Sequence, residues 1–271
     1  MSEEYARVVT NSTEIEELTD LVRMKGKGTD GKVTSLVEDA IINFEDDWVS
    51  VKAFDPMASV WTHIRGDFED VRSQGRLAIG SIDDFRSYLD RFGDKTIVSE
   101  EERGGVFYLT FNDENRKDGA YSATDEAHIQ SVEDVEELPY QYNTDEMDYP
   151  GVPEQGIYLD TWFRCDVSDI TDVINDGDTT EVRKFPFAVE DGHVSVRVGS
   201  DDKWIETEFD AYDGGGQAES LYGYGVDNVF SNISGEIEVY LADNSPMWIR
   251  ADNEDMDYVA DYMIAEDEES A

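Results

Sequence analysis

Apolar residues recur along the chain with the period of short helices and, between them, the alternation of strands. A first helix is predicted after Ser12 and Thr13, either of which can cap a helix N-terminus. Its buried face would consist of Ile15, Leu18, Leu21 and Val22. A second helix is predicted over Ile82–Phe92, with the apolar face Ile82, Phe85, Tyr88, Leu89 and Phe92.

Extended segments separate these two helices and follow them. Ala40–Phe44, an acidic turn and Trp48–Phe54 form a predicted strand, turn and strand. Ser59–Ile64 and Val106–Phe111 are also predicted to be strands. Many short strands with few short helices predict an α+β fold dominated by antiparallel sheet.

The second half of the chain repeats the first. Glu45–Lys52 recurs as Glu190–Arg197, and Ile82–Phe85 corresponds to Val226–Val229 at nearly the same offset. A third echo pairs Glu14–Val22 with Ser168–Ile174, so three echoes in one order predict two copies of one domain. The second copy is expected to contain helices on Val167, Ile170, Val173 and Ile174 and on Val226, Val229, Phe230 and Ile233, then strands over Ile237–Leu241 and Met247–Ile249.

An acidic, aromatic stretch without periodicity joins the two copies. It covers residues 132–155 and holds Pro139, Pro150 and Pro153. We therefore predict an N-terminal domain over residues 1–131, a connector over 132–155 and a C-terminal domain over 156–271.

Charge is the most unusual feature of the composition. The 271 residues include 65 acids and 21 bases, a formal net charge of −44, yet 39% are hydrophobic, so a sizeable core is expected. Self-repulsion on this scale is relieved in molar salt, where the Debye length is about 3 Å. We interpret the charge as adaptation to a high-salt cytosol, although an acidic chain could also bind basic partners. The N-terminus lacks a leader pattern and no apolar run is long enough for a membrane helix, so a cytoplasmic protein without membrane partners is expected.

No catalytic or metal site can be built from the motifs present. His63, His128 and His193 are isolated, and Cys165 is alone, which favours a buried, inert thiol. Asp113–Gly119 lacks the twelfth-position Glu of a calcium loop, and Gly214–Gly216, which lacks the Lys-Ser/Thr of a phosphate loop, is interpreted as a flexible hairpin tip. No enzymatic activity, cofactor or metal is therefore predicted.

Together, the repeat and an ordered set of segments resemble the sliding clamps of the proliferating-cell nuclear antigen (PCNA) family. The segments are Leu36–Ala40 through Trp48–Pro56, Leu77–Phe85, Val152–Gln155, Asn244–Met247 and Tyr262–Glu269. They cover essentially the whole chain, and Glu266 departs from the proline usual in the family's tail. With the charge, the resemblance implies a clamp of an extreme halophile or of its virus. Such a clamp would form a homotrimeric ring around double-stranded DNA, with helices lining the hole and strands pairing across subunit boundaries.

The resemblance also implies two sets of site residues. DNA polymerase, ligase, flap nuclease and clamp loader would bind through short peptides to a pocket formed by Phe54, Trp61, Leu138, Pro139, Pro246, Met263 and Ala265. The residues expected to face DNA are Arg23, Lys25, Lys27, Arg86 and Arg91.

The polar faces of the predicted helices are nevertheless acidic, whereas clamps normally present Lys and Arg to phosphates. Two hypotheses therefore remain open. One is a replication clamp, in which encirclement needs little direct affinity for DNA. The other is a degenerate clamp-like protein, viral or accessory, that binds partners without encircling DNA.

Overall fold

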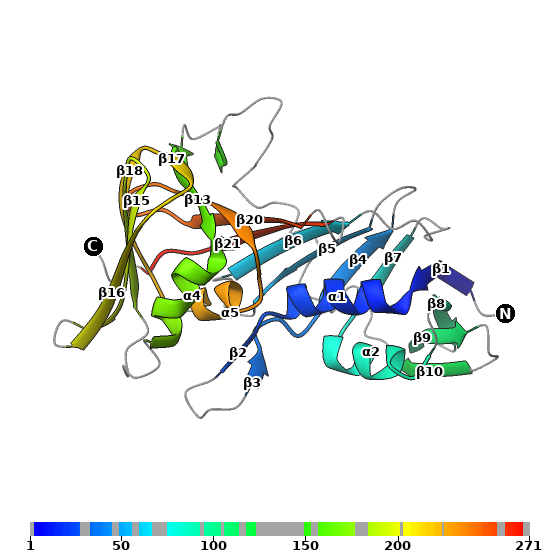
Figure 1. Ribbon diagram of the computed structural model, residues 1–271. Helices are drawn as coiled ribbons and strands as arrows, with labels where there is room; N and C mark the ends of the chain where they lie inside the picture. Colours follow the sequence, from blue (N-terminus) through cyan, green and yellow to red (C-terminus); the bar gives the residue numbers. More distant parts are fainter. Residues whose placement is uncertain are drawn as a thin grey trace.

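The described helices α1, α2, α4 and α5 lie on one side of a long sheet that runs through the molecule (Figure 1). The computed structural model describes residues 3–27, 33–44, 49–55, 60–66, 75–92, 95–103, 106–113, 118–122, 149–152, 157–176, 184–200, 203–223, 225–253 and 258–267. The predicted α+β class, mostly antiparallel sheet with a few short helices, is confirmed.

Elements of the first half are β1 (Glu3–Asn11), α1 (Ser12–Arg23), β2 (Lys25–Lys27), β3 (Val33–Ser35), β4 (Ala40–Phe44), β5 (Val49–Phe54), β6 (Val60–Gly66), β7 (Gly75–Ile79), α2 (Ile82–Leu89), β8 (Lys95–Arg103), β9 (Val106–Asp113) and β10 (Asp118–Ser122). Those of the second half are β11 (Gly151–Val152), β12 (Ile157–Tyr158), β13 (Thr161–Asp166), α4 (Val167–Asp176), β14 (Phe185–Glu190), β15 (His193–Ser200), β16 (Lys203–Asp210), β17 (Asp213–Gly215), β18 (Gln217–Tyr222), α5 (Val226–Phe230), β19 (Glu236–Leu241), β20 (Met247–Asn253) and β21 (Tyr258–Ile264).

Strand order reproduces the internal repeat. The order β1-β8-β9-β10 in the first half matches β13-β19-β20-β21 in the second, and β6-β5-β4-β7 matches β16-β15-β14-β18. An antiparallel pairing of β21 with β6 joins the two halves, so one nine-stranded sheet runs β17-β13-β19-β20-β21-β6-β5-β4-β7. Each half is therefore one copy of the same topology, and the seam between the copies is a strand pair.

Local sequence explains where the helices begin and end. Ser81 Oγ accepts from the Asp84 N–H at 3.2 Å and caps α2, and Asp166 Oδ1 accepts from the Ser168 N–H at 2.9 Å at the start of α4. That bond, together with one from the Ser168 hydroxyl, lowers the pKa of Asp166. The helix predicted to reach Phe92 ends at Leu89, because the following N–H groups turn back to Arg86, Tyr88 and Leu89. Phe92 still stacks on Phe111, as its apolar spacing indicated.

The periodic apolar residues form the core. All four residues predicted for the first helix and all four predicted for α4 are buried. In the second copy, the short helix α5 ends at Phe230, and Ile233 lies beyond it yet is buried.

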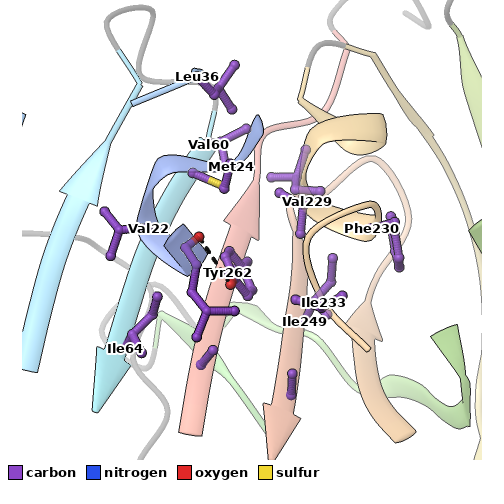
Figure 2. Close-up of a cluster of buried hydrophobic side chains, with 14 of the residues drawn as sticks. Val22, Met24, Leu36, Val60, Ile64, Val229, Phe230, Ile233, Ile249 and Tyr262 are labelled. Atoms are coloured by element: carbon purple, nitrogen blue, oxygen red, sulfur yellow. Dashed lines mark hydrogen bonds between the residues drawn. The ribbon is translucent and has the colours of Figure 1, made fainter. Parts of the chain in front are cut away.

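Both copies contribute to a single core at the seam (Figure 2). Side chains of Val22, Met24, Leu36, Val60 and Ile64 meet Val229, Phe230, Ile233, Ile249 and Tyr262 of the second copy. The Tyr262 hydroxyl donates to the Leu21 carbonyl at 3.4 Å, and burial raises the pKa of Tyr262. Asn228 Nδ2 donates to the Met24 carbonyl at 3.1 Å.

The triple glycine is not a hairpin tip, contrary to the sequence interpretation. β17 pairs with β13, whereas β18 belongs to the other sheet and pairs with β14, so the chain changes sheets at Gly216, where φ is +85°. A Cβ on Gly214 would lie 2.9 Å from the Trp162 carbonyl oxygen. Close backbone approach, not flexibility, accounts for glycine here.

Candidate partner-docking surface and helix-lined face

Large apolar side chains form one continuous row across the sheet face opposite the helices. Successive strands pair Phe54 with Trp61, Trp61 with Met263, Met263 with Trp248, Trp248 with Tyr240, and Tyr240 with Trp162. We call these six residues the aromatic row. Six strands at about 4.8 Å spacing make it about 24 Å long, and it crosses the seam between the copies.

Contacts between rings hold the row in place. The Trp61 and Trp248 ring centroids lie 5.6 Å apart, and Trp162 stacks on Tyr240 at 6.5 Å. Trp61, Trp248 and Tyr240 are buried, whereas Phe54 and Met263 are partly exposed. Leu159 is fully buried in the same cluster, and Tyr149 packs against it. The Phe54–Met263 end is thus one place where the described row reaches solvent.

A row of charged and polar residues runs beside the aromatic row, two residues away from it on each strand, before it or after it according to the strand's direction. Cross-strand register pairs Lys52 with His63, His63 with Asp261, Asp261 with Arg250, Arg250 with Glu238, and Glu238 with Arg164. Asp261 is at its centre and only 2% exposed.

The buried carboxylate of Asp261 links both rows and both copies. It accepts from Trp248 Nε1 at 3.1 Å and from Arg250 Nε and Nη2 at 2.8 and 3.0 Å. Arg65, on β6 of the first copy, donates to it at 3.3 Å. These bonds fix the Trp248 indole within the aromatic row.

The structure brings most of the predicted pocket residues onto this face. Phe54, Trp61 and Met263 belong to the aromatic row. The register that pairs Met247 with Ile264 places Pro246 beside Ala265. These two residues lie two positions along their strands from Trp248 and Met263. Leu138 and Pro139 lie outside the described residues, as do residues 132–148 and 153–155 of the predicted connector.

The tail that follows Ala265 is held against the second copy's other sheet. Glu266 forms a β-bridge with Tyr222, and the Asp267 N–H donates to the Leu221 carbonyl at 2.9 Å. Glu266 therefore extends the tail along β18.

On the opposite, helix-lined face, three of the five predicted DNA-facing cations are engaged by acids of the same chain. Arg23 Nε lies 2.8 Å from Asp83 Oδ1, Lys25 Nζ lies 3.3 Å from Asp20 Oδ1, and Arg86 Nη1 is paired with the same Asp20 oxygen. The remaining two predicted cations differ: the guanidinium of exposed Arg91 sits over the Tyr88 ring at 5.1 Å, and Lys27 ends β2.

Carboxylates dominate the rest of this face. The pKa of Glu16 is raised, first by partial burial and then by the neighbouring charge of Asp90. Neither α4 nor α5 contains a Lys or Arg. Direct phosphate contact along these helices would therefore meet more negative than positive charge.

Within the described part of the chain, nothing points to a metal or nucleophile site. No group of three or more His, Cys, Asp or Glu residues could hold a metal ion there. Cys165 is buried, and burial raises its pKa to about 12, so the thiol is protonated at neutral pH. No helix among these residues is long and apolar enough to span a membrane.

No protein-family model matches this sequence, and a search of curated proteins finds no match. Solved structures do match along essentially the whole chain. PCNA of A. fulgidus, bound to the C-terminal region of FEN-1, is 13% identical with a TM-score of 0.68, over 96% of this chain and 98% of that one. PCNA of Entamoeba histolytica is 8% identical with a TM-score of 0.66, over 98% and 100%. A chain of the PCNA2–PCNA3 complex of Sulfolobus tokodaii is 16% identical with a TM-score of 0.64, over 96% and 99%. The chain has the two-copy fold of PCNA sliding clamps.

Proposed function

We propose that this chain is a non-enzymatic sliding clamp: three copies joined head to tail encircle duplex DNA, while replication and repair proteins dock on the aromatic row. The single observation that carries the proposal is the β21–β6 seam. It joins β21, the last strand of one sheet type, to β6, the edge strand of the other. β10 and β16 hold the same two positions, and within the described residues each is paired on one side only, β10 with β9 and β16 with β15.

Repetition of this seam between subunits would generate a ring. β10 corresponds to β21, and β16 corresponds to β6, so β10 of one subunit can pair with β16 of the next in the same way. Such a head-to-tail contact closes into a ring when its rotation permits. Each subunit contributes two domain copies, and three subunits would give six.

Trp204 on β16 occupies the position that Trp61 occupies on β6. Phe54 pairs with Trp61 on one hairpin, and Gly199, at the matching position, pairs with Trp204 on the other. Trp61 is 8% exposed beneath its cross-seam neighbours, whereas Trp204 is 50% exposed. A large exposed aromatic side chain on an open strand edge is typical of an interface residue.

Docking of partner proteins is supported by the aromatic row. Aromatic and Met side chains that are partly exposed beside buried anchors form the surfaces that short peptides bind. DNA polymerase, ligase, flap nuclease and clamp loader are the proposed partners, and one similar PCNA carries the C-terminal region of FEN-1.

Encirclement would hold DNA by topology with little direct contact, given the acidic helix faces. The same acidity favours a second candidate, a clamp-like protein that binds partners but does not encircle DNA. The charge of −44 supports function in a high-salt cytosol, where screening reduces repulsion both within a subunit and between the face and phosphates.

Light scattering coupled to size-exclusion chromatography in molar KCl tests assembly. We expect a particle of three times the 30.7 kDa chain mass. Trp204→Asp should give monomers, whereas Tyr212→Asp, which alters another exposed aromatic residue off the β16 edge, should leave the trimer intact. A wild-type monomer at micromolar concentration would count against the ring.

A further inference from the structure

Three outward-facing residues of β6 each carry a buried polar atom that has no hydrogen-bond partner within the described part of the chain. These atoms are Trp61 Nε1, His63 Nε2 and Arg65 Nε. Trp61 is 92% buried, and none of the described residues supplies an acceptor to its indole N–H. An unsatisfied buried donor of this kind destabilises a protein, and several on one strand face indicate that acceptors are supplied by a bound molecule.

Their spacing specifies the shape of that molecule. Positions 61, 63 and 65 lie on one side of a strand and repeat about every 6.6 Å. The carbonyl groups on one side of an extended peptide repeat at the same distance. A peptide lying along β6 can therefore offer an acceptor to each position.

The charged residues around His63 indicate the charge that the bound peptide should carry. Lys52 and Arg65 flank the imidazole, Arg250 lies beyond Asp261, and all four charges act on His63. Burial, with Arg65 and Lys52, lowers the pKa of His63 to about 4, so the ring is neutral at neutral pH. Lys52, Arg65 and Arg250, which we call the cationic cluster, lie around His63 together with Asp261, and Glu238 is in register with Arg250 on the far side. Three cations gather here in a chain whose net charge is −44.

The second copy shows that the fold does not require this cluster. Arg197 matches Lys52 there, but its cross-strand partner is Glu206, in place of His63. Glu208 similarly takes the place of Arg65, opposite Ser195. The equivalent face of β16 is acidic, so the positive charge is a local property of β6, beside the aromatic row.

We propose that β6 binds an acidic, extended segment of the docked partner peptide. A carboxylate of the peptide lies over the cationic cluster, and its main-chain carbonyls accept from Trp61 Nε1 and Arg65 Nε. Apolar anchors of the same peptide reach the aromatic row at Met263. This inference rests on the docking function proposed above and specifies the chemistry of the partner.

A pair of synthetic peptides tests the proposal. Both carry one aliphatic and one aromatic anchor, and they differ only in the flanking extended residues, which are Asp in one and Asn in the other. Fluorescence anisotropy with the full chain in molar KCl should show the Asp peptide binding about fivefold more tightly, because charge-assisted hydrogen bonds to partly buried groups survive screening. Arg65→Gln should remove this preference and keep anchor binding. The control Arg91→Gln, on the helix-lined face, should preserve it.

The outcomes separate this inference from the function on which it rests. Equal affinity for the two peptides, or an Asp preference that survives in Arg65→Gln, overturns the acidic-segment proposal while docking stands. Binding of neither peptide overturns docking on this face and the inference together. Circular dichroism is the check that each variant is folded. Because the Arg65 side chain is 41% exposed, we expect glutamine at this position to leave the core intact.

Discussion

Removal of the Asp261 carboxylate should weaken the whole molecule, since this group joins the two copies and fixes the aromatic row. Its side chain is 3% exposed, and its oxygens accept from Trp248, from Arg250 twice and from Arg65. Breaking a buried ion pair by removing one partner typically costs about 3–5 kcal/mol. Asp261→Ala should lower the free energy of unfolding by that amount. Asp261→Asn keeps one acceptor oxygen and should cost about 1–3 kcal/mol.

Urea unfolding in molar KCl, followed by tryptophan fluorescence at one protein concentration, measures these changes. Arg65→Ala serves as the matched control: it removes the more exposed partner of the same carboxylate and should cost less than about 1 kcal/mol. Replacing both members of the buried pair, Arg250→Met with Asp261→Leu, should recover most of the loss. If Asp261→Ala unfolds within about 1 kcal/mol of the parent, Asp261 does not hold the seam.

Three further predictions concern pH, docking and salt. The folded-state pKa of His63 lies near 4, below its usual 6.5, so the unfolded chain takes up the proton first and His63 destabilises the fold as pH falls from about 6.5 to 4. His63→Gln should reduce that loss of stability, by at most about 3 kcal/mol, and the exposed His193→Gln should not; identical pH profiles would refute this. Met263→Asp should lower affinity for an anchor-bearing peptide at least about a hundredfold without dissociating the ring, because a charge cannot be buried unpaired in an apolar site; unchanged affinity would show that docking occurs elsewhere. Thermal melting should lose cooperativity and trimers should dissociate as salt is withdrawn; a cooperative, trimeric melt at millimolar salt would contradict adaptation to high salt.

Helices and the repeat were predictable because their signals are local. Ile15 and Leu18, or Ile170 and Val173, recur at helical spacing whatever they later contact. The strand β1, by contrast, carries Glu3 and Glu4, and its partner β8 lies far away in sequence. Strand pairing at that distance has no local signature.

The docking surface was only partly predictable. Met263 and Phe54 came from the resemblance, but Trp248, Tyr240 and Trp162 join them only once the register of five strand pairs is known. Trp248 and Tyr240 fell within predicted strands, where alternation could have placed them on one face. Asp261 could not be singled out, because no local pattern distinguishes a buried acid from the rest of the 65 acidic residues.

Loading onto circular DNA tests the central claim, encirclement, most directly. The protein, with a competent clamp loader, is placed on nicked circles in molar KCl, and the circles are then cut once with a restriction enzyme. Short linear duplexes should show no measurable binding, because Arg23, Lys25 and Arg86 on the helix-lined face are already engaged by acids and few phosphates could be neutralised. The account predicts retention on circles at molar salt and release only after linearisation. A trimeric protein that fails to load with a competent loader, or that stays bound after linearisation, would contradict it.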